Sequence, residues 1–326
     1  MRILSGIQPS GNLHLGNYFG MMKRMIAYQH DHELFCFIVN YHALTTQRDG
    51  ADLRAKTLEA AADFLALGLD PDRCTFWVQS DVPEVAELTW ILSNITGMGL
   101  LERCHSYKDK VAQGLVSNHG LFAYPVLMAA DILMLQAERI PVGQDQKQHL
   151  EVAQDIAEKF NHAYGTIFRV PEPDILKETG LLPGVDGRKM SKSYGNTIEI
   201  FSTQEALQKK VMSIKTDSRP VGETPDPASV AELPLFAIYA AFLDDAGREA
   251  LKKRFLSPAL RYSDLKKELA EKIWTHFEPF RARREALMAD PAGLKKILAK
   301  GAEKARAAAL PTLQAVRRTV GVDYRS

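Results

Sequence analysis

Residues 2–17 read RILSGIQPSGNLHLGN, a short apolar run followed by a glycine-bearing turn and the start of a helical pattern. The turn contains two overlapping near-matches to a phosphate-binding loop, Gly6-x4-Gly11 and Gly11-x4-Gly16. Neither is followed by the Lys-Ser or Lys-Thr pair with which such a loop reaches the outer phosphates and their magnesium. The stretch therefore predicts a strand, a turn that a nucleotide can approach closely, and a lysine supplied from elsewhere in the chain.

The first 160 residues or so alternate between strand-like and helix-like patterns. Short runs rich in β-branched and aromatic residues are separated by longer stretches with apolar residues at helical spacing. Such alternation is typical of βαβ units, which form a parallel sheet covered by helices on both faces. Ligands of such sheets bind outside the carboxyl ends of the strands. The expected strands are 2–7, 33–40, 75–81 and 138–143, and the expected helices are 15–30, 51–68, 83–97 and 145–161.

Between residues 82 and 125 the alternation lapses, which indicates a helical insertion that leaves the sheet and returns. Its apolar residues suit either contact with a second subunit or burial against the sheet of the same chain. They are Leu88, Trp90, Ile91, Ile95, Leu100 and Leu101. After residue 200 the strand patterns end and helical patterns follow. We therefore expect an α/β domain over residues 1–200 and an all-helical domain over residues 201–326.

Size and composition are those of an ordinary globular chain, with 326 residues of which 46% are hydrophobic and 25% charged. The three cysteines, Cys36, Cys74 and Cys104, are odd in number and far apart, which excludes a disulfide framework and a CxxC-type metal site. The N-terminus runs directly into a strand pattern, and no window approaches the roughly 18 apolar residues of a membrane span. We expect a cytoplasmic protein with no targeting segment, no membrane contact and no protein-bound metal.

The net charge of +1 hides an asymmetry along the chain. Residues 251–326 contain 18 Lys and Arg against 8 Asp and Glu, a net charge of +10, which leaves −9 for the residues before them. A basic tail is the electrostatic pattern expected of a protein that binds a polyanion. The alternative is a set of exposed helix faces that carry charges of both signs.

The lysine that the first turn lacks is found far downstream, in DGRKMSKSYGN at residues 186–196. Two lysines, two serines and the loop amides lie within five residues, which supplies ammonium groups and neutral donors for a phosphate chain. Gly187 and Gly195 bracket the loop and would allow it to move. By itself, a short basic stretch of this kind is more often an exposed turn.

HLGN at 14–17 followed by KMSKS at 189–193 resembles the paired signature of the class I aminoacyl-tRNA synthetases. Together with YPVLMAADIL and VGQDQKQHLE, the pair is similar to the tryptophanyl-tRNA synthetases over essentially the whole chain. The resemblance implies a Rossmann-type catalytic domain followed by a helical anticodon-binding domain, in a chain that forms a homodimer. Contact with the second subunit is one of the two expectations for the insertion at 82–125. The resemblance also implies L-tryptophan, ATP with Mg²⁺ as co-substrate, and tRNA(Trp) as ligands.

The resemblance implies that ATP binds residues from the first turn, the lysine of SYKDK, the turn after the fourth strand and the KMSKS loop. Asp145 is the candidate for the ribose hydroxyls. Lys110 also fits the alternative of an ordinary helix-surface residue. The implied residues are Gln8, Pro9, Ser10, Gly16, Asn17, Lys110, Gly143, Gln144, Asp145, Leu181, Lys189, Met190, Ser191, Lys192 and Ser193.

The resemblance also implies a tryptophan pocket, in which Asp131 accepts the hydrogen bond of the indole N–H. A carboxylate on the apolar helix VLMAADILMLQAE is costly unless it is paired, and the alternative is an exposed position beside a Lys or Arg. His42 and Tyr124 would orient the amino and carboxylate groups of the substrate, although a lone histidine after a strand is otherwise typical of a core. The implied residues are Gly6, His42, Tyr124, Met128, Asp131, Ile132, Val142 and Gln146.

The carboxylate of tryptophan is already ionised at neutral pH, so activation needs alignment and charge stabilisation rather than a general base. We expect His14, Lys189 and Lys192 to be the catalytic residues: His14 would contact the α-phosphate, and the two lysines would stabilise the leaving pyrophosphate. Asn17 departs from the last histidine of the HIGH motif, which removes one possible phosphate donor. The scattered cysteines predict that the iron–sulfur site of some relatives is missing here.

Three other interpretations stay open from the sequence. A tyrosine-specific relative shares both motifs, although MAADIL and QDQKQH resemble the tryptophan type. A small nucleotidyltransferase also uses a turn of the HxGH type, but the chain length, the basic helices and the complete KMSKS disfavour it. A synthetase-like protein that binds RNA without catalysis is disfavoured by the intact Asp131, His14, Lys189 and Lys192.

Overall fold

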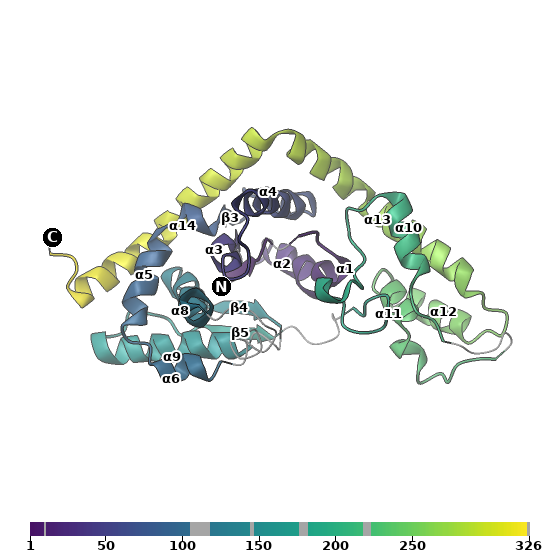
Figure 1. Ribbon diagram of the computed structural model, residues 1–326, viewed down its shortest axis with the longest axis horizontal. Coiled ribbons are helices and arrows are strands. Elements are labelled where there is room, and N and C mark those ends of the chain that lie inside the picture. The colour runs from purple at the N-terminus through teal and green to yellow at the C-terminus, as the bar shows by residue number, and fades with distance from the viewer. Residues whose placement is uncertain (10, 105–117, 144–146, 176–181, 218–222, 325–326) are drawn as a thin grey trace. The chain divides into compact units, whose positions relative to one another are not determined.

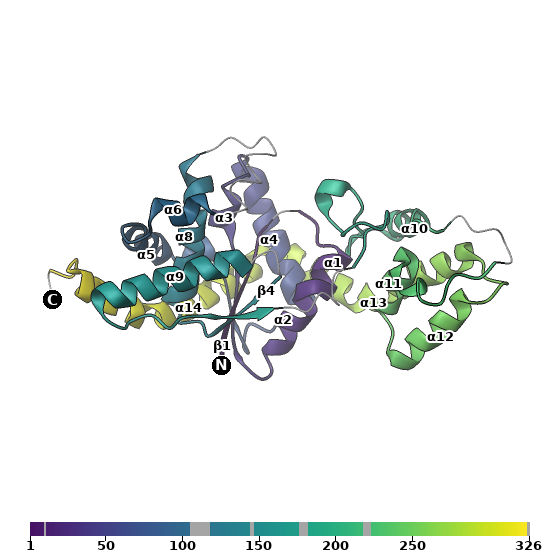
Figure 2. The same cartoon turned by 90° about the horizontal axis from the view of Figure 1, so that it is seen from below.

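The computed structural model of the chain describes residues 1–9, 11–104, 118–143, 147–175, 182–217 and 223–324. These residues form a parallel five-stranded sheet and a set of helices (Figures 1 and 2). The expected α/β class with a Rossmann-type sheet is confirmed, and the strand order is β3-β2-β1-β4-β5. The strands are β1 (Arg2–Ile7), β2 (Glu33–Ile38), β3 (Thr75–Val78), β4 (Arg139–Val142) and β5 (Glu172–Ile175).

Strand β5, with the sequence EPDI, was not among the expected strands. Its proline and two acidic residues give no β-branched run, which is the usual sequence signal for a strand. It pairs with β4 at the edge of the sheet, with Pro173 opposite Ile140. An edge strand tolerates proline because one side of its backbone needs no ladder hydrogen bonds.

The described contacts divide the chain into two compact units, and this division differs from a cut at residue 200. The sheet unit contains residues 1–11, 25–177 and 286–326, and the helical unit contains residues 12–24 and 178–285. The first-turn motif therefore groups by contact with the segment that carries KMSKS, and the last helix groups with the sheet. The catalytic and anticodon-binding roles expected for the two parts of the chain stay predictions.

The helices of the sheet unit follow the expected alternation and add a long C-terminal helix (Figure 1). Helices α5 and α6 of the expected insertion pack against α8, and α9 packs against α8 and β5. The helices are α3 (Asn40–Ala43), α4 (Gly50–Ala66), α5 (Glu84–Ser93), α6 (Met98–Glu102), α8 (His119–Met134), α9 (Lys147–Tyr164) and α14 (Pro291–Val320).

The helical unit begins with a single turn, α1 (Leu15–Asn17), and a π-helical segment, η1 (Tyr18–Met22). Helix α2 (Lys23–Tyr28) crosses the boundary between the two units, as does α13 near its C-terminal end. The remaining helices are α10 (Gln204–Met212), α11 (Pro234–Ala240), α12 (Asp245–Phe255) and α13 (Tyr262–Ala289). The rings of His276 and Phe277 in α13 lie edge-on to Tyr18 of η1, at centroid distances of 5.9 and 5.0 Å.

Helix α14 packs directly on the edge strand β3 and on α4, beside which it runs in Figure 1. The contact requires a glycine, because a Cβ atom at Gly301 would lie only 1.7 Å from the carbonyl oxygen of Phe76. The apolar face of α14 continues along the core through Ala305, Leu313 and Val316, which are all fully buried. The helix therefore covers an edge that would otherwise offer unpaired backbone groups.

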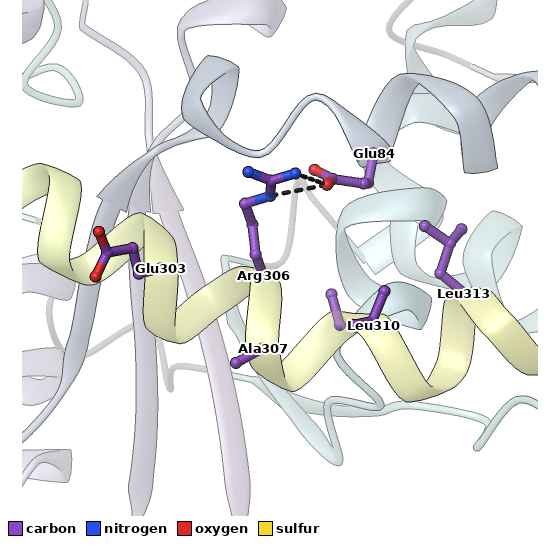
Figure 3. Close-up of a pocket in the computed structure, with 7 residues that line it drawn as sticks. Glu84, Glu303, Arg306, Ala307, Leu310 and Leu313 are labelled. Carbon is purple, nitrogen blue, oxygen red and sulfur yellow. Dashed lines mark hydrogen bonds and ion pairs between the residues drawn. The ribbon is translucent and has the colours of Figure 1, made fainter.

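Basic side chains of α14 form ion pairs with acidic residues of the sheet unit. Arg306 donates two hydrogen bonds to Glu84 on α5, beside a cavity of about 300 Å³ between the two helices (Figure 3). Arg317 pairs with Glu87 one turn along α5, at 2.5 Å. Part of the positive charge of the C-terminal region thus compensates acids of the same chain, which weakens the simple interpretation of that region as a polyanion-binding tail.

Most apolar residues of the insertion are buried against the sheet unit, and one is exposed as a subunit contact would require. Leu88 and Leu101 are buried in the core of the sheet unit, and three further residues of the set pack against that core. Trp90 on α5 is 72% exposed, and Met98 on α6 is 63% exposed. Among the helices of the described residues, none is long and apolar enough to cross a membrane.

Candidate active site

The first-turn motif and the segment after KMSKS are joined by main-chain hydrogen bonds within the helical unit. His14 forms an antiparallel bridge with Glu199. On either side of it, the Leu15 N–H donates to the Ile198 carbonyl (2.9 Å) and the Ile200 N–H donates to the Leu13 carbonyl (3.0 Å). Two segments that are more than 180 residues apart in sequence are therefore held in register.

His14 and Asn17 cap the helix that follows the first turn by bonding reciprocally. The Asn17 N–H donates to Nδ1 of His14 (3.3 Å), and the His14 N–H donates to Oδ1 of Asn17 (3.1 Å). This is the geometry of a capping box, which satisfies backbone donors at a helix start. The departure from the HIGH motif at Asn17 thus has a structural role, because the asparagine amide oxygen fixes the turn.

The His14 ring is neutral in this environment. Its side chain is buried, and burial, together with the nearby ammonium group of Lys192, lowers the pKa of His14 from 6.5 to about 4. Because Nδ1 accepts the hydrogen bond from Asn17, the proton of the neutral ring is assigned to Nε2. His14 can therefore offer one N–H donor to an oxyanion without carrying a charge.

Met190 connects the KMSKS loop to the same turn. The Gly16 N–H points at the sulfur of Met190 at 3.3 Å, and Met190 is 5% exposed. A Cβ atom at Gly16 would lie 3.0 Å from Nδ1 of His14 and 3.4 Å from Cβ of Met190, so a larger residue would crowd this junction. The methionine of KMSKS is thus an apolar anchor between the two motifs.

Asn196 holds the KMSKS loop from inside. Its side chain is 2% exposed and accepts from the Ser191 N–H (2.8 Å) through Oδ1. Its Nδ2 donates to the Lys189 carbonyl (3.0 Å) and to Oδ1 of Asp186 (2.8 Å). Gly184 lies so close that a Cβ atom there would meet Nδ2 of Asn196 at 2.2 Å. The sequence interpretation missed Asn196, although an asparagine directly after a turn glycine is a typical loop-fixing residue.

The loop carries three exposed basic residues, Arg188, Lys189 and Lys192. Arg188 donates to the carboxylate of Asp186 at 2.7 Å and stacks over the ring of Tyr194 at 4.5 Å. Hydrogen bonds from Asn196 and Arg188 lower the pKa of Asp186 to about 2. Lys189 and Lys192 are exposed as well. Both lysines are therefore accessible to a phosphate from solvent.

The hydroxyl groups of the loop lie beside these lysines. Oγ of Ser191 and Oγ of Ser193 are hydrogen-bonded at 2.9 Å, and a short 3-10 turn follows over Lys192–Tyr194. Gly187 and Gly195 have φ angles of +88° and +63°, which residues with a side chain rarely adopt. The two expected bracket glycines are therefore required by the loop conformation itself.

In the sheet unit, Asp131 lies on α8 with a buried side chain, 5% exposed. The alternative of an exposed aspartate beside a Lys or Arg is therefore wrong. Nε2 of His42 lies 2.9 Å from Oδ2 of Asp131, and Nε2 of Gln79 donates to both carboxylate oxygens at 3.0 and 2.9 Å. Burial raises the pKa of Asp131, and the bonds from His42 and Gln79 oppose that shift.

The remaining polar groups near Asp131 come from helices α3, α8 and α9. The ring of His42 lies edge-on to that of Tyr124 at 6.3 Å, and the Tyr124 hydroxyl bonds Nε2 of His149 at 2.6 Å. The side chain of His42 is 14% exposed, so His42 is not fully enclosed in the core. His42 therefore contacts Asp131, and its expected role toward the amino and carboxylate groups of the substrate stays a prediction.

Apolar candidates for the tryptophan pocket lie around this polar group. Ile132 and Val142 are buried at 2% and 6% exposure, and Met128 is partly exposed. Gly6, at the end of β1, is exposed, and a Cβ atom there would meet Cγ1 of Val39 at 2.6 Å. The candidate residues thus follow the carboxyl ends of adjacent parallel strands, where ligands of such sheets bind.

Gln8 and Pro9 directly follow β1, with Gln8 exposed and Pro9 buried, and Gly143 follows β4. Six expected site residues lie outside the described part of the chain, so their positions remain predictions. These are Ser10, Lys110, Gln144, Asp145, Gln146 and Leu181. Within the described residues no group of three His, Cys, Asp or Glu side chains is arranged to hold a metal ion.

Sequence and structure match known proteins along nearly the whole chain. Residues 1–278 match the family model of the tRNA synthetases class I (W and Y). The tryptophan–tRNA ligase of Campylobacter jejuni is 48% identical over 322 residues, which cover 99% of this chain and 100% of that protein. The tryptophan–tRNA ligase of Fusobacterium nucleatum is also 48% identical, with 98% of each chain covered.

Among solved structures, the tryptophanyl-tRNA synthetase from C. jejuni complexed with ADP and tryptophan matches with a TM-score of 0.92 at 48% identity, covering 98% of this chain and 100% of that one. The identity extends over the full chain, both motifs are held in register, and a buried aspartate lies on the expected helix. These three observations support the same family assignment. The chain belongs to the class I tRNA synthetases for tryptophan and tyrosine, and within them to the tryptophanyl-tRNA synthetases.

Proposed function

We propose that the chain is a tryptophan–tRNA ligase that activates L-tryptophan with ATP to tryptophanyl-adenylate. It then transfers tryptophan to tRNA(Trp), and the two steps release pyrophosphate and AMP. The 48% identity to tryptophan–tRNA ligases over the full chain favours this activity over the tyrosine-specific, nucleotidyltransferase and non-catalytic interpretations. The ADP and tryptophan bound by the C. jejuni relative support ATP and tryptophan as ligands here.

The observation that carries the choice of amino acid is the environment of Asp131. A tryptophan side chain has one polar group, the indole N–H donor, and a buried carboxylate among apolar residues is its natural acceptor. Phenylalanine, which lacks the donor, would leave that acceptor without a partner and would bind poorly. The buried position of Asp131 and its contact with His42 support this role.

The phosphates of ATP are assigned to the helical unit. His14, neutral and with its Nε2 proton available, donates to an α-phosphate oxygen as negative charge develops there. Lys189 and Lys192 bind the β- and γ-phosphates and stabilise the leaving pyrophosphate. No proton must be removed from the attacking carboxylate, because it is ionised at neutral pH. Mg²⁺ enters with ATP as part of the substrate.

The buried Asn196 supports a loop that closes in a defined shape, because its three bonds hold the Ser191 N–H, the Lys189 carbonyl and the Asp186 carboxylate. Such a loop can approach the triphosphate as a unit, with the two lysines already placed. The ATP-binding assignments of Gln8, Pro9, Gly16, Asn17 and Gly143 rest on the family motif and on their positions at the turns.

A homodimer is proposed through the face of α5 and α6 that carries Trp90 and Met98. Exposed aromatic and methionine side chains are enriched at protein interfaces. Both residues belong to the insertion, whose other apolar side chains are packed inward. The anticodon-binding role of the region after residue 200 and a cytoplasmic location stay predictions from the sequence.

Pyrophosphate exchange into ATP tests the proposal. The wild-type chain and Asp131→Ala are assayed with tryptophan, tyrosine and phenylalanine. Exchange that depends on tryptophan alone and is lost in the variant is the expected result. Exchange with tyrosine would move the chain to the tyrosine-specific branch, and no exchange with any amino acid would overturn the catalytic assignment.

A further inference from the structure

Gln79 occupies a position that the family motifs do not mark. It is the first residue after β3, in the 3-10 turn Gln79–Asp81, and only 1% of it is exposed. The Tyr41 N–H donates to its Oε1 at 3.0 Å, which assigns the carbonyl end of the amide to the α3 side. The NH₂ end is therefore turned toward α8, where it meets Asp131.

The bonds from Gln79 to both oxygens of Asp131 restrict rotation of the carboxylate. Nε2 of Gln79 lies 3.0 Å from Oδ1 and 2.9 Å from Oδ2, so it bridges the two oxygens. His42 approaches Oδ2 at 2.9 Å. A carboxylate has about four acceptor positions on its two oxygens, and these contacts use three of them. The remaining position is on Oδ1.

From this count, and on the basis of the proposed function, we propose that Gln79 is a positioning residue that sets selectivity for the indole N–H. It acts through Asp131, without touching the substrate, by turning the one remaining acceptor position of Oδ1 toward the amino acid side chain. Without the Gln79 amide, the carboxylate can rotate about its bond to Cβ toward His42. The remaining acceptor position of Oδ1 is then no longer directed at the indole N–H of the substrate.

The test compares two amino acids that differ in this donor alone. In β-(3-benzothienyl)alanine a sulfur replaces the indole N–H, while the shape of the bicyclic ring is retained. Pyrophosphate exchange is measured with tryptophan and with this analogue for the wild type and for Gln79→Met, which keeps the length and loses the amide. Gln29→Met is the matched control, because Gln29 is also buried and bonds the Gly68 carbonyl and the Asp70 N–H elsewhere in the sheet unit.

We expect Gln79→Met to lower kcat/KM for tryptophan by about 10-fold or more and to change kcat/KM for the analogue by less than about 3-fold. Gln29→Met should leave the ratio of the two substrates at its wild-type value. An equal loss with both substrates in Gln79→Met would show a structural role only and would overturn the proposal. Wild-type kcat/KM values with both substrates would overturn it as well.

Gln79→Glu provides a second variant should the methionine variant fail to fold. It keeps the shape and the bond from the Tyr41 N–H, but it sets a carboxyl group against Asp131. The same loss of preference for tryptophan over the analogue is expected, and an unchanged preference would contradict the proposal. If the wild type shows no tryptophan-dependent exchange, the proposed function fails before the role of Gln79 is reached.

Discussion

Replacing Asn196 with alanine should uncouple the KMSKS loop from its fixed shape. The substitution removes three hydrogen bonds at once and leaves the Ser191 N–H and the Lys189 carbonyl without their partner. It also removes the bond that Asp186 receives from Nδ2. The lysine side chains that are assigned to pyrophosphate are untouched by the change, so any loss of activity reports on their placement.

The size of the effect follows from these bonds. A net hydrogen bond between neutral groups contributes about 1 kcal/mol, and one to a charged group contributes about 2 kcal/mol, which gives an upper limit near 4 kcal/mol. Water can enter from the exposed side of the loop and replace part of the lost hydrogen bonding. We therefore expect a loss of about 2–3 kcal/mol in the ordering of the loop, or roughly 30- to 150-fold in kcat/KM for ATP.

The assay is tryptophan-dependent pyrophosphate exchange with ATP as the varied substrate. Asn161→Ala is the matched control, because Asn161 also makes three hydrogen bonds, to the backbone of Ile167 and Phe168 in the sheet unit. Both variants should lower the melting temperature, but only Asn196→Ala should lower kcat/KM for ATP. Wild-type kinetics in Asn196→Ala, or an equal kinetic loss in the control, would refute the reasoning.

Three further predictions concern other parts of the chain. Because the pKa of His14 is about 4 in the folded chain against 6.5 in the unfolded one, the buried ring should lower stability as pH falls from 6.5 to 4, by up to about 3 kcal/mol. His14→Asn should accordingly flatten this part of the stability curve in pH-dependent thermal melts, and an unchanged slope would count against a neutral His14. Gly301→Ala should destabilise the sheet unit by more than about 3 kcal/mol through its clash with β3, whereas Ala299→Gly on the exposed side of α14 should cost about 1 kcal/mol, as measured by melting temperature. Trp90→Ala should weaken self-association about 30-fold in sedimentation velocity, and a wild type that stays monomeric at all concentrations would exclude this interface.

The sequence was most informative where the pattern is local. The strand β1 and its glycine-bearing turn could be predicted because a short apolar run and a cluster of glycines are visible within 16 residues. The motif residues of KMSKS were found in the same way. Strand β5 was missed because its sequence carries no apolar run, and only pairing with β4 makes it a strand.

The residues that hold the site from behind could not be predicted, because their roles depend on long-range contacts. Gln79 is a polar residue at a strand end, and it meets Asp131, 52 positions further along the chain, only in the folded structure. Asn196 belongs to the predicted loop, but its role could not be predicted because the sequence does not reveal the loop conformation that surrounds it. The candidate residues that bind ligands were thus easier to name than the residues that position them.

The close contact between Gly301 and Phe76 also constrains how the chain is made. The two residues are separated by 225 positions, so at roughly 5–20 residues per second β3 waits about 10–45 s on the ribosome before α14 is synthesised. During that interval the edge of the nascent sheet is uncovered and can pair with other chains. Helix α14 thus completes the packing of a strand that is translated well before it. Truncation after residue 290 should therefore yield an aggregating product rather than a smaller folded enzyme.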